Sequence, residues 1–123
     1  PQYFPEDMIT DQPERFIIAE IIREKALLNL DEEVPHGIFV EVEKVKGRED
    51  KDLIDVFATI YCEKESHKGI IIGKGGRMLR AIGKSAREDI ERLMASKINL
   101  QLWVKVEKDW RDRENKVRYF GYK

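Results

Sequence analysis

The stretch from Ser66 to Arg87 constrains the fold of this 123-residue chain more than any other segment. It reads SHKGIIIGKGGRMLRAIGKSAR and holds five of the eight glycines, four of them between Gly69 and Gly76, around the apolar triplet at residues 70–72. Gly73 to Gly76 have the form G-x-x-G, a short turn with little side-chain bulk, which lets another backbone approach closely. An apolar segment on each side of this turn predicts two helices joined by a tight connection.

The same stretch carries only positive charge. Its cations are Lys68, Lys74, Arg77, Arg80, Lys84 and Arg87, and it contains no Asp or Glu. The whole chain has 23 basic and 24 acidic residues, so the local field is basic although the protein is not.

The cations have a defined place on the predicted second helix. Leu79, Ile82, Ala86, Ile90 and Leu93 recur at helical spacing and form one apolar stripe. At ~100° per residue, the cations from Arg77 to Arg87 fall within about 80° on a different face. A helix N-terminus, a glycine turn and a row of cations together predict a phosphate-binding surface, and the alternative is a solvated basic face.

A nucleotide-triphosphate site is excluded. Gly83-Lys84-Ser85 resembles the end of a P-loop, G-x-x-x-x-G-K-[ST]. That pattern requires glycine at position 78, where this chain has Met78, and no apolar strand leads into it. No paired carboxylates, Ser/His/Asp set or metal cluster stands out, so we predict no catalytic and no metal-binding residue.

Length and composition indicate one domain. The sequence is 41% apolar and 38% charged, as expected for a well-charged globular protein with one core. Its apolar runs fall far short of the ~20 residues that span a bilayer, and no secretory signal is evident. The single cysteine, Cys62, cannot form an internal disulfide, which favours a reducing cytosol. Because the chain starts at Pro1 without Met, we expect an excised domain or a processed product.

The segment before residue 31 predicts a lead-in and a helix. Residues 1–12 contain two prolines and show no clear period, so we expect a linker. Asp11 and Glu14 resemble a capping box, Pro13 fits a first helical turn, and the pattern continues to about Leu30. The apolar residues Phe16, Ile17, Ile21, Ala26, Leu27 and Leu28 cover a wide arc, which predicts packing on a sheet. Glu20, Arg23, Glu24 and Lys25 are expected on the solvent face.

Three segments alternate with a period of two, as half-buried strands do. They lie at residues 38–43, 54–62 and 98–107. Trp103 falls on the polar face of the third, where we expect cover by another element or, as the alternative, a contact surface. Trp110, Val117 and Phe120 lie at roughly helical spacing and predict a short final helix.

These elements predict an α+β fold, a three-stranded mixed sheet backed by helices. The order αββααβ plus a C-terminal helix, with Ile72 and the G-x-x-G turn between two helices, resembles the type II K-homology (KH) RNA-binding domain over residues 13–123. In KH modules a GXXG loop clamps four backbone nucleotides.

Further segments resemble the C-terminal KH domain of the Era family of bacterial GTPases. They lie at residues 5–7, 10–11, 13–17, 19–25, 33–36, 70–76, 103–106, 110–111 and 121–122. The resemblance implies binding to the 3′ end of small-subunit (16S) ribosomal RNA, and thus a role in small ribosomal subunit maturation. It also implies a cytoplasmic protein, with a peripheral position at the inner membrane face as a further implication.

The sequence departs from that family in one large respect, because the N-terminal GTPase domain is absent. GTP and Mg²⁺ would belong to that domain, so we expect no cofactor and no enzymatic activity in this chain. The expected partners are single-stranded RNA, the small subunit and the parent's GTPase domain, and the chain is expected to be monomeric.

The predicted RNA site is a groove beside the G-x-x-G turn. Its floor would be Ile70, Ile71, Ile72, Leu79 and Ile82, although Leu79 and Ile82 could equally be core. The facing wall would be the edge of the strand at residues 53–62. The phosphates would be approached by the turn residues Gly73, Lys74, Gly75 and Gly76. Lys74, Arg77 and Arg80 would neutralise them. The other predicted RNA-binding residues are Lys68 and Lys84. The alternatives are a KH domain of another RNA-binding protein and a protein-interaction domain whose basic face binds an acidic partner.

Overall fold

The computed structural model describes residues 12–30 and 37–116. Their elements are α1 (Gln12–Asn29), β1 (Ile38–Gly47), β2 (Leu53–Cys62), α2 (Glu65–Ile72), the short helix η2 (Lys74–Gly76), α3 (Arg77–Met94), β3 (Lys97–Val106) and α4 (Trp110–Lys116). The predicted order of elements is confirmed. Of the predicted lead-in only Gln12 is described, and it already belongs to α1. Asp11, Val117 and Phe120 lie outside the described residues.

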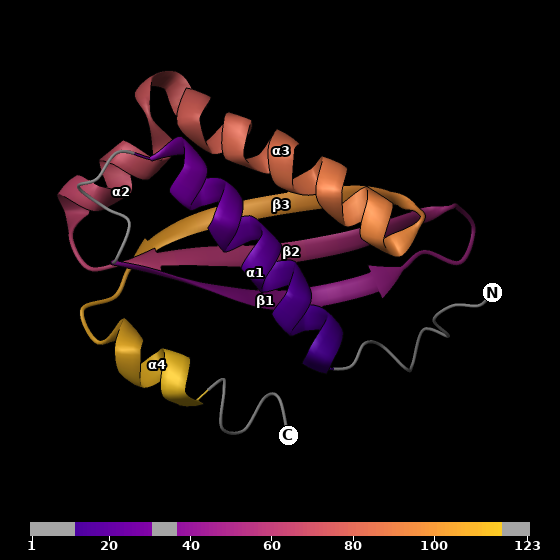
Figure 1. Cartoon of the computed structure of the whole chain (residues 1–123), viewed down its shortest axis with the longest axis horizontal. Helices are drawn as coiled ribbons and strands as arrows, with labels where there is room; N and C mark the ends of the chain where they lie inside the picture. The colour runs from indigo at the N-terminus through magenta and orange to yellow at the C-terminus, as the bar shows by residue number, and fades with distance from the viewer. Residues whose placement is uncertain (1–11, 31–36, 117–123) are drawn as a thin grey trace.

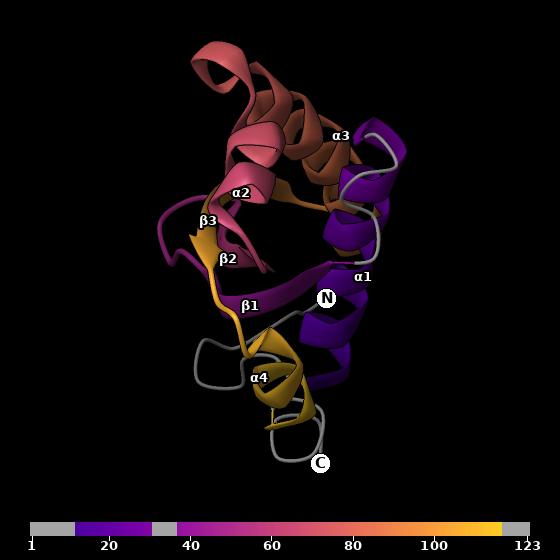
Figure 2. The same cartoon turned by 90° about the vertical axis from the view of Figure 1, so that its left-hand side faces the viewer.

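The three strands form one mixed sheet in the order β1-β2-β3. β1 pairs with β2 in antiparallel fashion, and β2 pairs with β3 in parallel fashion. Helices α1 and α3 lie on one face of this sheet, whereas α4 lies beside β1, away from α2 and α3 (Figures 1 and 2). The predicted α+β fold is therefore confirmed. No helix in the described part of the chain is long and apolar enough to cross a membrane.

The core lies between the sheet and the two long helices. Its fully buried side chains include Ile18 and Ile22 of α1, Ile82 and Ile90 of α3, and Ile60 of β2. Burial of such side chains contributes roughly 1.5–3 kcal/mol each, so this layer supplies most of the stabilisation.

The apolar arc of α1 is narrower than the sequence predicts. Ile17 and Leu28 are 44% and 72% exposed, and Leu93 of α3 is 47% exposed. The buried residues of α1 are Ile18, Ala19, Ile22 and Ala26. Because α1 packs against both α3 and β1, only the stripe that faces this junction is covered.

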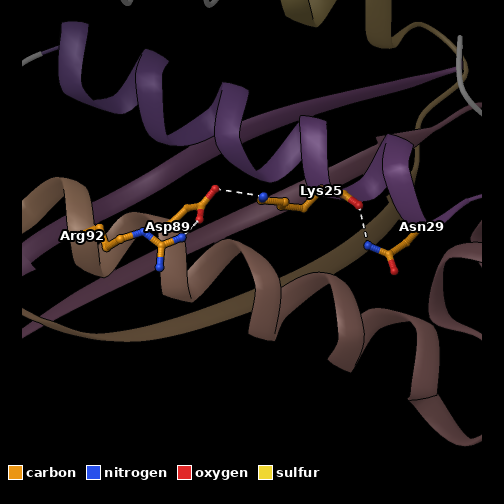
Figure 3. Close-up of polar contacts among 4 residues, drawn as sticks. All are labelled: Lys25, Asn29, Asp89 and Arg92. Carbon is orange, nitrogen blue, oxygen red and sulfur yellow. Dashed lines mark hydrogen bonds and ion pairs between the residues drawn. The ribbon is translucent and has the colours of Figure 1, made fainter.

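Lys25 is also placed differently from the prediction. Its ammonium pairs with the carboxylate of Asp89 on α3 at 2.9 Å, and Arg92 binds the same carboxylate (Figure 3). The hydrogen bond from Lys25 holds the pKa of Asp89 below its ordinary value. Lys25 thus joins the two helices at the rim of the core instead of extending into solvent.

On the outer face of the sheet, Asp55 connects all three strands. Arg48, just after β1, donates to both carboxylate oxygens of Asp55, at 3.0 and 2.9 Å. Asn99 of β3 donates to the same carboxylate at 2.9 Å. The Arg48 hydrogen bonds lower the pKa of Asp55, which is nearly buried.

We expect Asp55→Asn to lower the free energy of unfolding at neutral pH, because an amide cannot accept both sets of hydrogen bonds. A carboxyl whose folded pKa is depressed stabilises the fold above its unfolded pKa, about 3.8–3.9, and loses that contribution as the pH falls through the folded value. Urea unfolding at pH 7 and near pH 3 measures this. The difference in free energy of unfolding between parent and variant should be smaller near pH 3 than at pH 7. An equal difference at both pH values would contradict the stabilising role of the Asp55 carboxylate.

Trp103 is not covered in the way that the sequence favours. The side chain is 45% exposed and packs edge-to-face on Phe57, with ring centroids 5.7 Å apart. The final helix lies against β1 instead, where Arg113 pairs with Glu41 at 2.7 Å and lies over the ring of Tyr61. The expected cover of Trp103 by another element is therefore wrong, and the alternative, a contact surface, stays a prediction.

Candidate nucleic-acid interface

The G-x-x-G turn has a backbone that only its glycines adopt readily. Gly73, Gly75 and Gly76 have φ values of +76°, +62° and +78°. These lie in the region that L-residues with a Cβ atom avoid. At Gly73 space is limiting as well, because a Cβ there would lie 2.7 Å from Cβ of Met78. At Gly75 nothing lies within 4 Å of such an atom.

We expect Gly73→Ala to destabilise the fold by at least about 1 kcal/mol, since both φ and the Met78 contact oppose a methyl group. Gly69→Ala is the matched control, because it lies in α2 with nothing within 4 Å of an added Cβ. Helix propensity should make that control neutral or stabilising by up to about 1 kcal/mol. Chemical unfolding of both variants tests the difference, and equal stabilities would contradict it.

A groove of about 620 Å³ runs from this turn along α3. It is lined by Gly76, Leu79, Arg80, Gly83, Lys84 and Arg87, and by Leu100 and Leu102 of β3. The leucines form an apolar floor, and the cations from α3 form the rim. Gly83 adds no side chain to the floor, and a Cβ there would be in ordinary contact, at 3.7 Å, with a methyl carbon of Leu102.

The facing wall of the groove is β3, which corrects the prediction that it would be the strand at 53–62. β2 is the central strand and hydrogen-bonds to a neighbour along both edges, so it has no free edge. Leu100, Leu102, Gly83 and Arg87 were absent from the predicted site. The alternating pattern of β3 indicated that the two leucines share one face, and the cation sector of α3 included Arg87. The pattern did not give the strand order, which places β3 beside α3.

The predicted apolar floor also needs correction. Ile71 and Ile82 are completely buried, so they belong to the core and support the groove from beneath. Ile70 and Ile72 are partly buried against that core and do not line the groove. Leu79 is the predicted floor residue that does line it.

The predicted cations are in different situations. Lys74, Arg77 and Lys84 are exposed, whereas Lys68 of α2 is partly buried and outside the groove lining. The guanidinium of Arg80 donates to the carbonyl oxygen of Gly75 at 3.0 Å and so holds the turn.

Arg87, at the far end of the groove, pairs with Glu91 at 3.3 Å. Glu91 also accepts the backbone N–H of Ile98 at the start of β3, and this bond together with Arg87 lowers its pKa. Glu91 therefore links α3 to the start of β3 at the far end of the groove.

The sheet order, the glycine turn and the groove define a KH domain. A family model described as "KH domain" matches residues 33–111, and the chain belongs to that family. It is similar to proteins named GTPase Era, with 67% identity over 122 residues to that of Alkaliphilus oremlandii and 64% to that of Clostridioides difficile.

Each of these two alignments covers 99% of the chain and 41% of the relative, so the chain spans about two fifths of their length. Among solved structures, it is similar to Era in complex with MgGDPNP and nucleotides 1506-1542 of 16S ribosomal RNA. That similarity has 45% identity and a TM-score of 0.80, and it covers 99% of this chain and 41% of the other.

Proposed function

We propose that this chain binds single-stranded RNA in the groove between α3 and β3, as the KH domain of an Era-type GTPase. The observation that carries the proposal is the groove itself, with an apolar floor, a cationic rim and a glycine turn at one end. The similar Era structure with a 16S ribosomal RNA segment supports the choice of ligand.

The parts of the groove suit different parts of a nucleotide. Gly75 has open space around it, so a sugar-phosphate backbone can approach the turn closely. Exposed Lys74 and Arg77 supply positive charge there, and the N-terminus of α3 adds its dipole. Bases would lie on Leu79, Leu100 and Leu102. Because β3 is an edge strand, its outward backbone groups are open to base edges, which would give sequence preference.

The wider setting is part of the same proposal. The RNA would be 16S ribosomal RNA and the assembly the small ribosomal subunit, in the cytoplasm and with the chain as a monomer. GTP and Mg²⁺ would belong to a part of the parent protein outside these 123 residues, and contact with the inner membrane would be peripheral.

The first test replaces Lys74 and Gly75 together with Asp. The fold should lose only about 1 kcal/mol, because Gly75 has positive φ but ample space. One cation disappears and two anions appear beside the phosphates, so affinity for single-stranded RNA should fall about a hundredfold or more, roughly 3 kcal/mol. Thermal unfolding and RNA affinity are measured on the same sample at one salt concentration.

The control is Lys51→Asp, an exposed position in the turn between β1 and β2. It should leave RNA affinity nearly unchanged. A duplex of the same sequence should bind the parent more weakly than the single strand. If the folded double variant binds as tightly as the parent, or if the duplex binds equally well, the groove is not an RNA site.

The second test separates Arg77 from Arg80. About three phosphate contacts, from the exposed Lys74, Arg77 and Lys84, predict a log–log salt slope near −2 for single-stranded RNA, at roughly 0.7 per contact. Arg77→Ala should flatten the slope by about 0.7. Arg80→Ala should weaken binding with a smaller change in slope, because its guanidinium holds the Gly75 carbonyl. Equal flattening by both variants would instead make Arg80 a phosphate contact.

A further inference from the structure

Trp103 is exposed on the face of the sheet opposite to α1 and α3. Strand residues two apart share a face, so Gln101 and Lys105 point the same way, and all three are exposed. Phe57, opposite Gln101 on β2, packs against the indole and fixes its orientation. An amide, an indole and an ammonium group therefore follow one another along the outer side of β3.

Charges of both signs lie around Trp103, and two of the cations, Lys44 and Lys105, are placed to meet an anionic ligand. Three carboxylates point outward from β1 and β2, and each is engaged. Glu41 pairs with Arg113, Asp55 binds Arg48 and Asn99, and Glu43 accepts a hydrogen bond from Thr59 at 2.8 Å. Lys44 lies over the ring of Phe57 at 4.8 Å, and Lys105 lies beyond Trp103 on the exposed strand.

This surface is continuous with the groove through a single strand. Leu100 and Leu102 line the groove from the inner side of β3, and Trp103 follows directly on the outer side. β3 is an edge of the sheet, and α4 packs at the opposite edge, on β1 (Figures 1 and 2). An RNA strand that left the groove over the β3 edge would meet the indole of Trp103 directly.

We propose that RNA longer than the groove crosses the edge of β3 and stacks a base on Trp103, with Lys105 and Lys44 near the adjoining phosphates. This inference rests on the proposed function. Stacking on an exposed aromatic ring is tolerant of sequence because every base has a π-face. The groove would select the RNA segment, and the Trp103 surface would add affinity for its continuation.

The test uses two RNAs derived from the sequence of nucleotides 1506-1542 of 16S ribosomal RNA. The short one is the smallest single-stranded piece whose binding is lost in the Lys74 and Gly75 double variant. The long one adds about four single-stranded nucleotides at each end. Trp103→Ala should weaken the long RNA about tenfold, as expected for one stacked base, and leave the short RNA unchanged. Trp103→Phe should retain most of the affinity because it keeps a π-face.

A direct readout comes from fluorescence in a Trp110→Phe background, where Trp103 is the sole tryptophan of the chain. The long RNA should quench it and the short RNA should not. Lys105→Glu is a second variant, at a residue outside the contact between Trp103 and Phe57, and it should weaken the long RNA only.

The outcomes are distinguishable. Equal affinities of the parent and Trp103→Ala for the long RNA, without quenching, would overturn the extended site and leave the groove proposal intact. Equal losses for both RNAs would also overturn it, because Trp103 would then act through the wall of the groove. If no piece of the RNA depends on the glycine turn, the proposed function itself fails.

Discussion

The parallel pairing of β2 with β3 determines where everything else in this domain lies. Leu53 pairs with Lys97 and Cys62 with Val106, so the chain leaves β2 at one end of the sheet and must return to the other. The 18 residues of α3 cover ~27 Å, close to the ~33 Å of a 10-residue strand. Helix α3 therefore runs back along the sheet, and α2 and the glycine turn remain at the Cys62 end.

The groove follows from this return path. α3 buries Ile82, Ala86 and Ile90 against the core, and its cations point to a different side. At ~100° per residue Gly83 lies between the buried stripe and the cation sector, facing Leu102 of β3. The boundary between the two faces of one helix is thus the place where the apolar floor and the charged rim meet. A larger side chain at Gly83 would fill the groove at this point.

The turn between α2 and α3 combines a geometric need with a functional one. The chain must reverse over a few residues while Met78 stays close to the backbone of Gly73. Positive φ at three glycines permits the reversal, and the absence of side chains leaves room for a ligand backbone. Arg80 completes the arrangement from the first turns of α3 by holding the Gly75 carbonyl. The residues that make the fold possible and those proposed to approach RNA are therefore partly the same.

Local patterns in the sequence were sufficient for the elements, their order and the glycine turn, because helical and strand periodicities act over a few residues. They were also sufficient for the cation sector of α3, which depends only on helix geometry. The patterns could not show that β3 forms the groove wall, that Ile71 is completely buried or that Lys25 reaches Asp89, since each depends on which elements become neighbours. Trp103 shows the same division. Strand alternation placed it on the outer face, but only the packing of α4 against β1 left it open, because cover is decided by contacts between segments far apart in the chain.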